Sequence, residues 1–294
     1  MKKKSLIVSS FLALGAIGAF AQTTTPASAP EAATAATAAA AAASEPAPSP
    51  FTANINLTTK YKFRGQDQGN TKWFSPALQG GFDWSANGFY VGNWNSNVSF
   101  SNAAIEMDFY GGYKGEIAKD LAYDVGILQY YYPQKDRVID FNTTEIYGAL
   151  TYSFFTVKYS HTVSSDYFGI GEAQQAGASG AGVGISRPKG RNTGYLEGSA
   201  NFPLVDKLTL NAHVGYTRYA SDIRNASYTI GASTTTTNVG VPNFYDYKLG
   251  VTYDMSAIMG SGVSAAAAIV GANKRSFYGD INKPRVILTL SKSM

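Results

Sequence analysis

The chain has 294 residues, of which 24 are Lys or Arg, 20 are Asp or Glu and none is Cys, so its formal net charge is +4. The lack of cysteine excludes disulfide bonds and thiol chemistry, and leaves stability to strand pairing and packing. Three lysines stand at the extreme N-terminus; 24 less these 3 leaves 21 basic residues against 20 acidic ones, which gives no reason to expect a nucleic-acid partner.

Residues 1–21 have the pattern of a secretory signal peptide. Lys2–Lys4 precede an apolar run over Leu6–Phe20, and Ala19–Ala21 has the small-x-small form of a cleavage site. The run is too short to anchor the chain in a membrane as a helix. We therefore expect export, with a mature chain that starts near Gln22.

Residues 22–50 consist mostly of Ala, Thr, Pro and Ser, with an alanine run over Ala38–Ala43 and a proline-rich end over Pro46–Pro50. A segment so poor in large apolar side chains cannot form a packed core, and its proline-rich end is stiff and extended. The composition predicts a low-complexity periplasmic tether. Contact with the cell wall or with a partner is the alternative.

From Asn54 onward the side chains alternate in character. One set is largely apolar and consists of Ile55, Leu57, Thr59, Tyr61 and Phe63. The other set is polar or charged and consists of Asn56, Thr58, Lys60, Lys62 and Arg64. A period of two places the two sets on opposite faces of a β-strand. After the signal peptide no stretch approaches the roughly 20 apolar residues that a membrane helix requires, so the apolar content is spread over strands.

The same alternation recurs along the chain, with connections that are alternately short and long. We expect strands at 54–64, 73–85, 88–98, 103–114, 119–132, 141–152, 154–162, 193–203, 207–219, 243–254, 262–270 and 284–293. Short turns at one end and long loops at the other are typical of outer-membrane barrels. The predicted fold is all-β, a transmembrane antiparallel up-and-down β-barrel of about 12 strands over residues 51–294, with ten or fourteen strands as alternatives.

Charged side chains with inward parity are expected to line the lumen, because Lys or Arg on the lipid face costs about 2–4 kcal/mol at mid-membrane. The basic candidates are Lys60, Lys62, Arg64, Lys158, Lys248 and Arg285. The acidic candidates are Glu106, Asp108, Asp124, Glu145 and Glu197. We expect Lys60, Lys62, Arg64 and Arg285 to form one wall of the lumen, facing Glu106, Asp108, Asp124 and Glu145 on the other.

Two alternatives follow from these charges. The walls could form an open constriction with a transverse field, which orients dipolar solutes and sorts ions. They could instead pair across a filled lumen and hold the barrel shut. Barrels of about eight strands are filled by their own side chains and those of sixteen or more leave channels, so twelve lies between. Long loops such as 163–192 could fold inward and decide the outcome.

Several motifs resemble one known family, the TorF-type porins of proteobacteria. They occur in order along the chain, at Tyr61–Gly65, Pro76–Asp83, Gly88–Gly92, Tyr123–Gly126, Leu208–Tyr216, Tyr247–Gly250 and Thr289–Ser293. The resemblance implies an outer-membrane porin and brings no catalytic residues. Members usually end in Phe, the residue that the barrel-assembly machinery prefers, whereas this chain ends in Met294. Because Met is apolar and shares the outward parity of Leu290, we expect insertion to be slower but to survive.

The sequence therefore predicts a porin in the outer membrane of a Gram-negative bacterium, passing small hydrophilic solutes or ions by passive diffusion. The expected partners are outer-membrane lipid and lipopolysaccharide, the barrel-assembly machinery and a small solute; no interface signature defines an oligomeric state. The alternative is a plugged or gated barrel that binds a partner through long loops such as 133–140 and 220–242.

An outer-membrane lipid hydrolase is the remaining alternative and is disfavoured. That chemistry requires a His beside a nucleophilic hydroxyl. His161 has outward parity with Val163 as its same-face neighbour, and His213 has inward parity among polar residues. Two histidines without cysteine also make a transition-metal site unexpected. We expect no enzyme activity, no cofactor and no metal.

Overall fold

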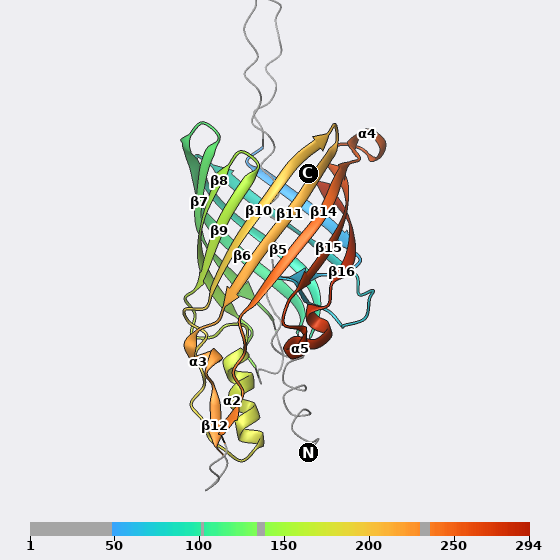
Figure 1. Cartoon of the computed structure of the whole chain (residues 1–294). Helices are drawn as coiled ribbons and strands as arrows, with labels where there is room; N and C mark the ends of the chain where they lie inside the picture. The colour runs from blue at the N-terminus through green and yellow to red at the C-terminus, as the bar shows by residue number, and fades with distance from the viewer. Residues whose placement is uncertain (1–48, 101–102, 134–138, 230–235) are drawn as a thin grey trace, which may run out of the picture.

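The computed structural model describes residues 49–294 except 101–102, 134–138 and 230–235, so the predicted signal peptide and most of the predicted tether lie outside the described residues. Twelve strands form a closed antiparallel barrel in the ring order β1-β16-β15-β14-β11-β10-β9-β8-β7-β6-β5-β4 (Figure 1). None of the described helices is long and apolar enough to cross a membrane.

The wall strands range from 8 to 16 residues. They are β1 (Phe51–Thr58), β4 (Ala77–Ala86), β5 (Phe89–Phe100), β6 (Ala103–Ala118), β7 (Leu121–Tyr131), β8 (Thr143–Tyr152), β9 (Phe155–Thr162), β10 (Gly194–Val205), β11 (Leu208–Arg218), β14 (Phe244–Asp254), β15 (Val263–Ala272) and β16 (Arg285–Ser293). The connections contain β2 (Lys62–Phe63), β3 (Gln66–Asp67), α2 (Ile170–Gly180), α3 (Ser221–Arg224), β12 (Ser227–Thr229), β13 (Thr236–Asn238), α4 (Ser256–Met259), α5 (Arg275–Tyr278) and η1 (Gly279–Asn282).

The predicted twelve-strand antiparallel barrel is confirmed, and every predicted strand overlaps one strand of the wall. The largest error concerns the first strand, which was expected to run to Arg64 but ends at Thr58. Residues 60–64 keep the alternating pattern, yet they leave the wall and enter the barrel interior. The next strand begins at Ala77 instead of residue 73, because the connection between the two is longer than expected.

Tight turns lie at one end of the barrel and long connections at the other (Figure 1). The tight turns place residues at positive φ, as primed two-residue hairpins require at Asn87–Gly88 and Ser153, and as bulged hairpins require at Asp120 and Lys207, which lie beside register shifts. These residues are Asn87 (φ 51°), Gly88 (φ 85°), Asp120 (φ 62°), Ser153 (φ 53°) and Lys207 (φ 63°). The C-terminus lies at the tight-turn end, whereas α2, α3, α5 and β12 extend from the opposite end.

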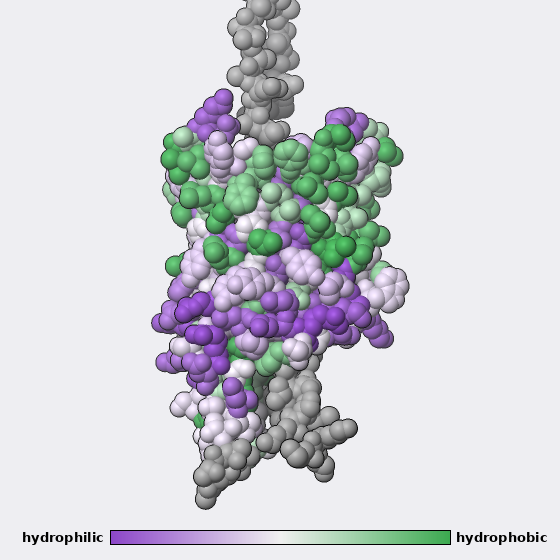
Figure 2. Space-filling view, in the orientation of Figure 1, coloured by the Kyte–Doolittle hydropathy of each residue, from purple (hydrophilic) through white to green (hydrophobic). Residues whose placement is uncertain are grey.

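The outer face of the wall is apolar. Large exposed side chains on it include Leu57, Leu78, Phe82, Val91, Ile127, Leu150, Val214, Leu249, Ile269 and Val286. Figure 2 shows that hydrophobic residues gather over the half nearer the tight turns, and hydrophilic residues over the end with the long connections. An exposed apolar surface of this kind is what a barrel presents to lipid.

The ring closes where the first wall strand meets the last. Asn54–Thr58 pair with Thr289–Ser293, and Met294 continues the ladder, since its backbone N–H donates to the Ala53 carbonyl at 2.8 Å and its carbonyl accepts from the Ala53 N–H at 2.9 Å. The C-terminal Met therefore extends the closing seam.

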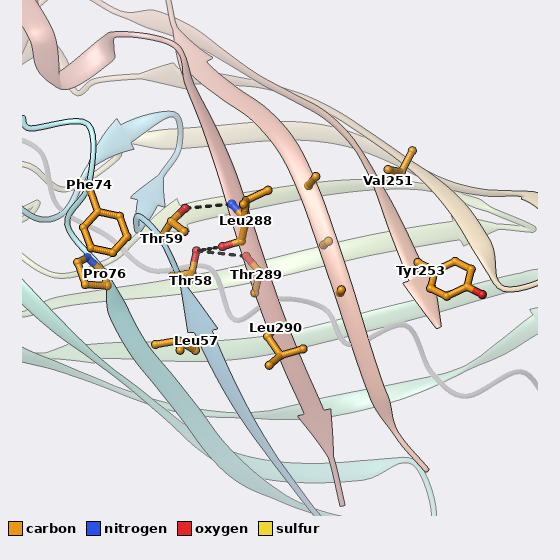
Figure 3. Close-up of a pocket in the computed structure, with 13 residues that line it drawn as sticks. Leu57, Thr58, Thr59, Phe74, Pro76, Val251, Tyr253, Leu288, Thr289 and Leu290 are labelled. Atoms are coloured by element: carbon orange, nitrogen blue, oxygen red, sulfur yellow. Dashed lines mark hydrogen bonds between the residues drawn. The ribbon is translucent and has the colours of Figure 1, made fainter. Parts of the chain in front are cut away.

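A groove of about 580 Å³ runs along the outer wall beside this seam (Figure 3). Its floor is the small side chains of Ala265–Ala267, and larger ones such as Leu57, Leu290 and Tyr253 stand around it. Thr59 ends the seam at the groove, where its hydroxyl accepts the Leu288 N–H at 3.0 Å. The groove belongs to the apolar exterior, so it is not a candidate for a hydrophilic solute.

The two faces of the wall should respond differently to an added charge. Leu249, 57% exposed at the centre of β14, should not tolerate Arg, and Leu249→Arg should lower the free energy of unfolding in lipid by about 2–4 kcal/mol. Thr209→Arg on the inner face of β11 is the matched control and should cost much less. Urea unfolding in liposomes, followed by tryptophan fluorescence, measures both; equal losses would contradict the assignment of the faces.

Candidate functional site

The interior of the barrel holds a hairpin made from the first long connection. We call residues 60–68 the inward hairpin; all nine are buried. Its arms are β2 and β3, in which Lys62 pairs with Asp67 and Phe63 with Gln66. Arg64 (φ 44°) and Gly65 (φ 74°) form the turn between them, a left-handed conformation that Gly adopts freely and Arg only at a cost of roughly 1–2 kcal/mol.

The ends of this connection are pinned together at the wall. The Ser75 N–H donates to the Thr59 carbonyl at 3.1 Å, and Lys60 and Ser75 form an isolated parallel bridge. The connection therefore leaves the wall and returns to it at one place, and no other strand has to break for the inward hairpin to sit in the lumen.

Lys60 and Lys62 are held by the inward hairpin itself and by neighbouring loops. The Asp67 carboxylate lies 3.2 Å from the Lys60 ammonium and 2.8 Å from that of Lys62, with all three side chains fully buried. Lys60 also donates to the Asn70 and Lys72 carbonyls, and Lys62 to the Gly65 and Ile281 carbonyls. The wall of basic residues expected on the first strand is therefore wrong for these two lysines, because the strand ends before them.

One arm of the inward hairpin packs against β5, β6 and β7. The Tyr61 hydroxyl donates to Glu106 at 2.8 Å, and the Tyr61 ring meets Trp94 edge to face at 5.8 Å. Phe63 packs in the same way on Tyr130 at 6.1 Å. These contacts cover the acidic side of the lumen with aromatic rings.

The tip reaches the far side. Arg64 donates through both terminal nitrogens to the Glu145 carboxylate on β8, at 3.1 and 2.8 Å, and β8 is five places from β1 in the ring of twelve strands. It also donates to the Tyr167 hydroxyl at 2.7 Å, and its guanidinium lies 4.0 Å from the centre of the Tyr195 ring on β10. Arg64 and Glu145, predicted on opposite walls, are thus brought into direct contact.

The turn fits closely against β14 and β15. A Cβ on Gly65 would lie 2.4 Å from the Gly271 carbonyl oxygen and 2.7 Å from the Asp246 Cβ. Beside it, the Gln66 amide donates to the Asn282 side-chain oxygen at 2.8 Å. The inward hairpin therefore contacts the wall on both sides of the lumen and obstructs it near the long-connection end.

The long connections close over this arrangement. Their buried apolar side chains form one cluster with those of the inward hairpin, including Ile139, Phe141, Tyr167, Phe168, Ile170, Tyr219, Ile223 and Tyr278. Phe168 packs on Phe63 at 6.0 Å. The 163–192 loop, which we expected could fold inward, thus contributes one part of the closure, and the inward hairpin contributes the part that crosses the lumen.

Glu106 and Asp108 lie side by side on β6, both with no exposed surface. Glu106 accepts hydrogen bonds from Tyr61 and Tyr132. Neither oxygen of Asp108 has a hydrogen-bond partner among the described residues, and the Trp94 indole nitrogen opposite it has none either. A buried carboxylate without a donor or cation is destabilising, so Asp108 marks an unsatisfied place in the closed lumen.

The other predicted charges lie nearer the tight turns or at the rim. Asp124 accepts the Tyr90 hydroxyl at 2.5 Å, and the Lys158 ammonium lies 4.3 Å from the Tyr147 ring centre. Lys248 is half-buried on β14, and Arg285 donates to the Thr71 carbonyl at the start of β16. Asp124, Lys158 and Lys248 are half-buried, and Arg285 lies at the rim on the long-connection side.

The two histidines lie on opposite faces of the wall, as their parity in the sequence predicted. His213 stands between two acidic side chains, with Nδ1 3.4 Å from Glu197 and Nε2 3.0 Å from Asp246. His161 lies on the outer face, where its Nε2 is 3.2 Å from the Asn192 side-chain oxygen. No group of three or more His, Asp or Glu side chains within the described ranges has a metal-binding arrangement.

Sequence reasoning missed three residues that organise the site: Asp67, Gly65 and Tyr195. One local signal was present, since a Gly inside an alternating run suggests a turn or a close approach of backbones. Gly65 fulfils both. Asp67 and Tyr195 gave no signal, because their roles arise only when the inward hairpin meets the wall.

Asp108 and Asp124 allow a comparison of how a buried carboxylate affects thermal stability without and with a hydrogen-bond donor. Asp108→Asn should raise the thermal transition of the folded barrel, because it removes a buried carboxylate that lacks a partner. Asp124→Asn should lower it, because it weakens the acceptor of the Tyr90 hydroxyl. Heat-modified migration on gels reports both; a loss of stability in Asp108→Asn would contradict the unsatisfied state of this side chain.

Comparisons with solved structures return matches at low sequence identity. A NanC porin is 9% identical over 81% of this chain and 97% of that chain, with a TM-score of 0.47. OprD of Pseudomonas aeruginosa is 14% identical over 83% of this chain and 66% of that chain, with a TM-score of 0.37. OccAB3 of Acinetobacter baumannii is 8% identical over 81% and 59%, with a TM-score of 0.38.

No curated protein matches the chain. The comparisons do not confirm the TorF-type name, which stays a resemblance. A family model described as bacterial protein of unknown function, Gcw_chp, matches residues 40–293. The chain therefore belongs to the Gcw_chp family of bacterial proteins, whose function is unknown.

Proposed function

We propose that this protein is an outer-membrane channel for small hydrophilic solutes, and that the inward hairpin is its gate in the closed position. The observation that carries the proposal is the position of residues 60–68. A loop, and not the side chains of the wall, occupies the interior of the closed barrel near its long-connection end. A loop can leave the lumen while the wall stays intact.

The membrane location rests on the distribution of polarity. The outer face of the wall exposes large apolar side chains such as Leu57, Val91 and Leu249, while the inner face carries charged and amide groups. This is the reverse of a soluble barrel with an apolar interior, and it suits a wall between lipid and water. With the C-terminus at the tight-turn end, that end is assigned to the periplasm.

The channel rests on the width of the ring. A barrel of about eight strands is filled by its own side chains, whereas a wider one has space for a plug or a solute. Here the inward hairpin takes that space near the outer end. The inner half is lined by half-buried polar side chains such as Asp124, Lys158 and His213.

The hinge of the gate is the pinned base at Thr59 and Ser75. Beyond this base, Arg64–Glu145 is the one ion pair that the described structure shows between the inward hairpin and the wall. The pairs of Lys60 and Lys62 with Asp67 lie within the hairpin and can travel with it. Opening would leave Glu106, Asp108 and Glu145 facing the lumen, which favours passage of cations.

A surface-binding role is the second candidate, and one observation favours it. The elements α2, α3 and the β12–β13 pair stand together beyond the wall, where the Gln174 amide donates to the Ile223 and Val239 carbonyls, both at 2.9 Å. Loops on a rigid scaffold commonly bind partners. Removing residues 226–239 would abolish binding in that case, whereas a channel would keep or raise its conductance.

The gate can be locked by a cross-link, since the chain has no cysteine of its own. Gln66 and Asn282 hydrogen-bond through their side chains, so Gln66→Cys with Asn282→Cys should be bridged by a short bifunctional thiosulfonate. We expect single-channel steps in a planar bilayer before bridging, silence after it, and recovery with reductant. Gln66→Cys alone, treated with the same reagent, is the control.

Two results would overturn the gate. Conductance that persists unchanged in the bridged double variant means that the inward hairpin does not close the path. A correctly folded, unbridged protein that never conducts means that the lumen is permanently plugged, and it favours the surface-binding candidate.

Closure by the 163–193 connection should depend on pH through Asp166. Burial raises the pKa of its carboxyl to about 6 from 3.8, and Arg187 at 3.2 Å offsets this only in part, while Glu172 and Asp140 add to it. Because the folded state holds the proton more tightly, the stabilisation is complete below about pH 4 and is lost as the pH rises through about 6. Hydrogen exchange of α2 amides, corrected for intrinsic rates, should show greater protection at pH 5 than at pH 8. Asp166→Asn should remove the difference, and an unchanged difference would contradict this assignment.

A further inference from the structure

The pocket that holds the tip of the inward hairpin has the features of a ligand site. We propose that this pocket binds the guanidinium group of a solute, and that Arg64 occupies it as a tethered substitute in the closed state. The inference rests on the proposed function, since it requires the inward hairpin to move.

The pocket is built for a flat cation with two parallel donors. Glu145 presents both oxygens to the two terminal nitrogens of Arg64, and the Tyr167 hydroxyl accepts from one of them. The Tyr195 ring lies on one face of the guanidinium at 4.0 Å. A forked pair with a carboxylate combined with stacking on an aromatic ring is specific to guanidinium, since an ammonium is a compact point charge that makes neither contact in full.

Most of the pocket belongs to the wall and the outer loops. Glu145 lies on β8, Tyr195 on β10 and Tyr167 in the connection after β9. Of the side chains around the guanidinium, Phe63, whose ring centre is 4.5 Å away, comes from the inward hairpin. The recognition groups therefore remain in place when Arg64 departs.

Departure of Arg64 without a replacement would leave Glu145 without its cation. Glu145 is 2% exposed, and the carboxylates of Glu106 and Asp108 are on the same side of the lumen. With the inward hairpin gone, three neighbouring carboxylates face the lumen without a cation, and like charges so placed repel one another. A guanidinium solute that takes the place of Arg64 removes this penalty, so its binding favours the open position of the inward hairpin.

The hydrogen bonds made by Arg64 also indicate which nitrogen of a bound guanidinium group can carry an alkyl substituent. The Arg64 Nε is buried and has no hydrogen-bond partner among the described residues. The pocket therefore engages the two terminal nitrogens and makes no demand on the third. Monoalkyl guanidinium groups, as in arginine and small arginine derivatives, fit this arrangement.

Chemical rescue of a truncated side chain tests the pocket. Arg64→Ala should lower the thermal transition of the refolded mature barrel, and ethylguanidinium at millimolar concentration should restore it with a saturable dependence. Ethylammonium, of equal charge, should not. In Arg64→Ala/Glu145→Gln the rescue should be lost. Equal effects of the two cations, or rescue that survives Glu145→Gln, would overturn the proposal.

Arg64→Lys supplies a second route should Arg64→Ala fail to refold. It keeps the charge but loses the fork, so ethylguanidinium should displace the lysine and raise the transition temperature, again only while Glu145 is present. No shift with Arg64→Lys would count against the site.

Rescue and conductance together distinguish the proposed guanidinium site from the proposed channel function. In wild-type protein in a planar bilayer, ethylguanidinium should raise the opening frequency more than ethylammonium at equal concentration. Rescue of Arg64→Ala in a protein that never conducts would keep the site and reject the channel. Conductance without any rescue would keep the channel and reject the site.

Discussion

The ion pair between Arg64 and Glu145 is the constraint on which the closed lumen depends. It joins a loop to the far wall with two parallel hydrogen bonds in a place where both side chains are buried. Neither charge is tolerable alone in that setting. The aromatic rings around it, from the wall and from the outer loops, exclude the water that would otherwise screen it. The closed position of the inward hairpin is therefore held by the Arg64–Glu145 ion pair, and aromatic side chains pack around that pair.

Placing the interaction in a barrel of twelve strands explains why a loop is needed. The wall alternates apolar and polar side chains, which satisfies lipid outside and leaves polar groups inside. A ring of twelve strands lies between barrels that their own side chains fill and barrels that keep a channel, and here a loop occupies the interior. The inward hairpin brings its own compensation, with Asp67 between Lys60 and Lys62, so only Arg64 needs a charged partner on the wall.

The sequence was sufficient to predict the wall and insufficient to predict the inward hairpin, for one physical reason. Alternation reports which face a side chain takes, so every wall strand could be predicted from it. Alternation does not report whether a segment stays in the wall. Residues 60–64 have the same alternating pattern as β1, but they lie inside the barrel. The contact of Arg64 with Glu145 was implicit in the alternative of paired charges. Its location depends on the turn at Gly65, which fits the backbone of β15 and gives no periodic signal.

The anchoring of the inward hairpin also has a consequence for assembly. Its chain emerges from the first wall strand, yet its partners are Glu145 on β8, Tyr195 on β10 and Asn282 just before β16. Gln66 and Asn282 are separated by 216 residues. Contacts so distant along the chain form late, because ordering the long intervening segment must come first. The hairpin can thus complete its set of contacts only after the chain as far as Asn282, next to the last strand, is in place, which makes closure of the lumen a reporter of correct assembly.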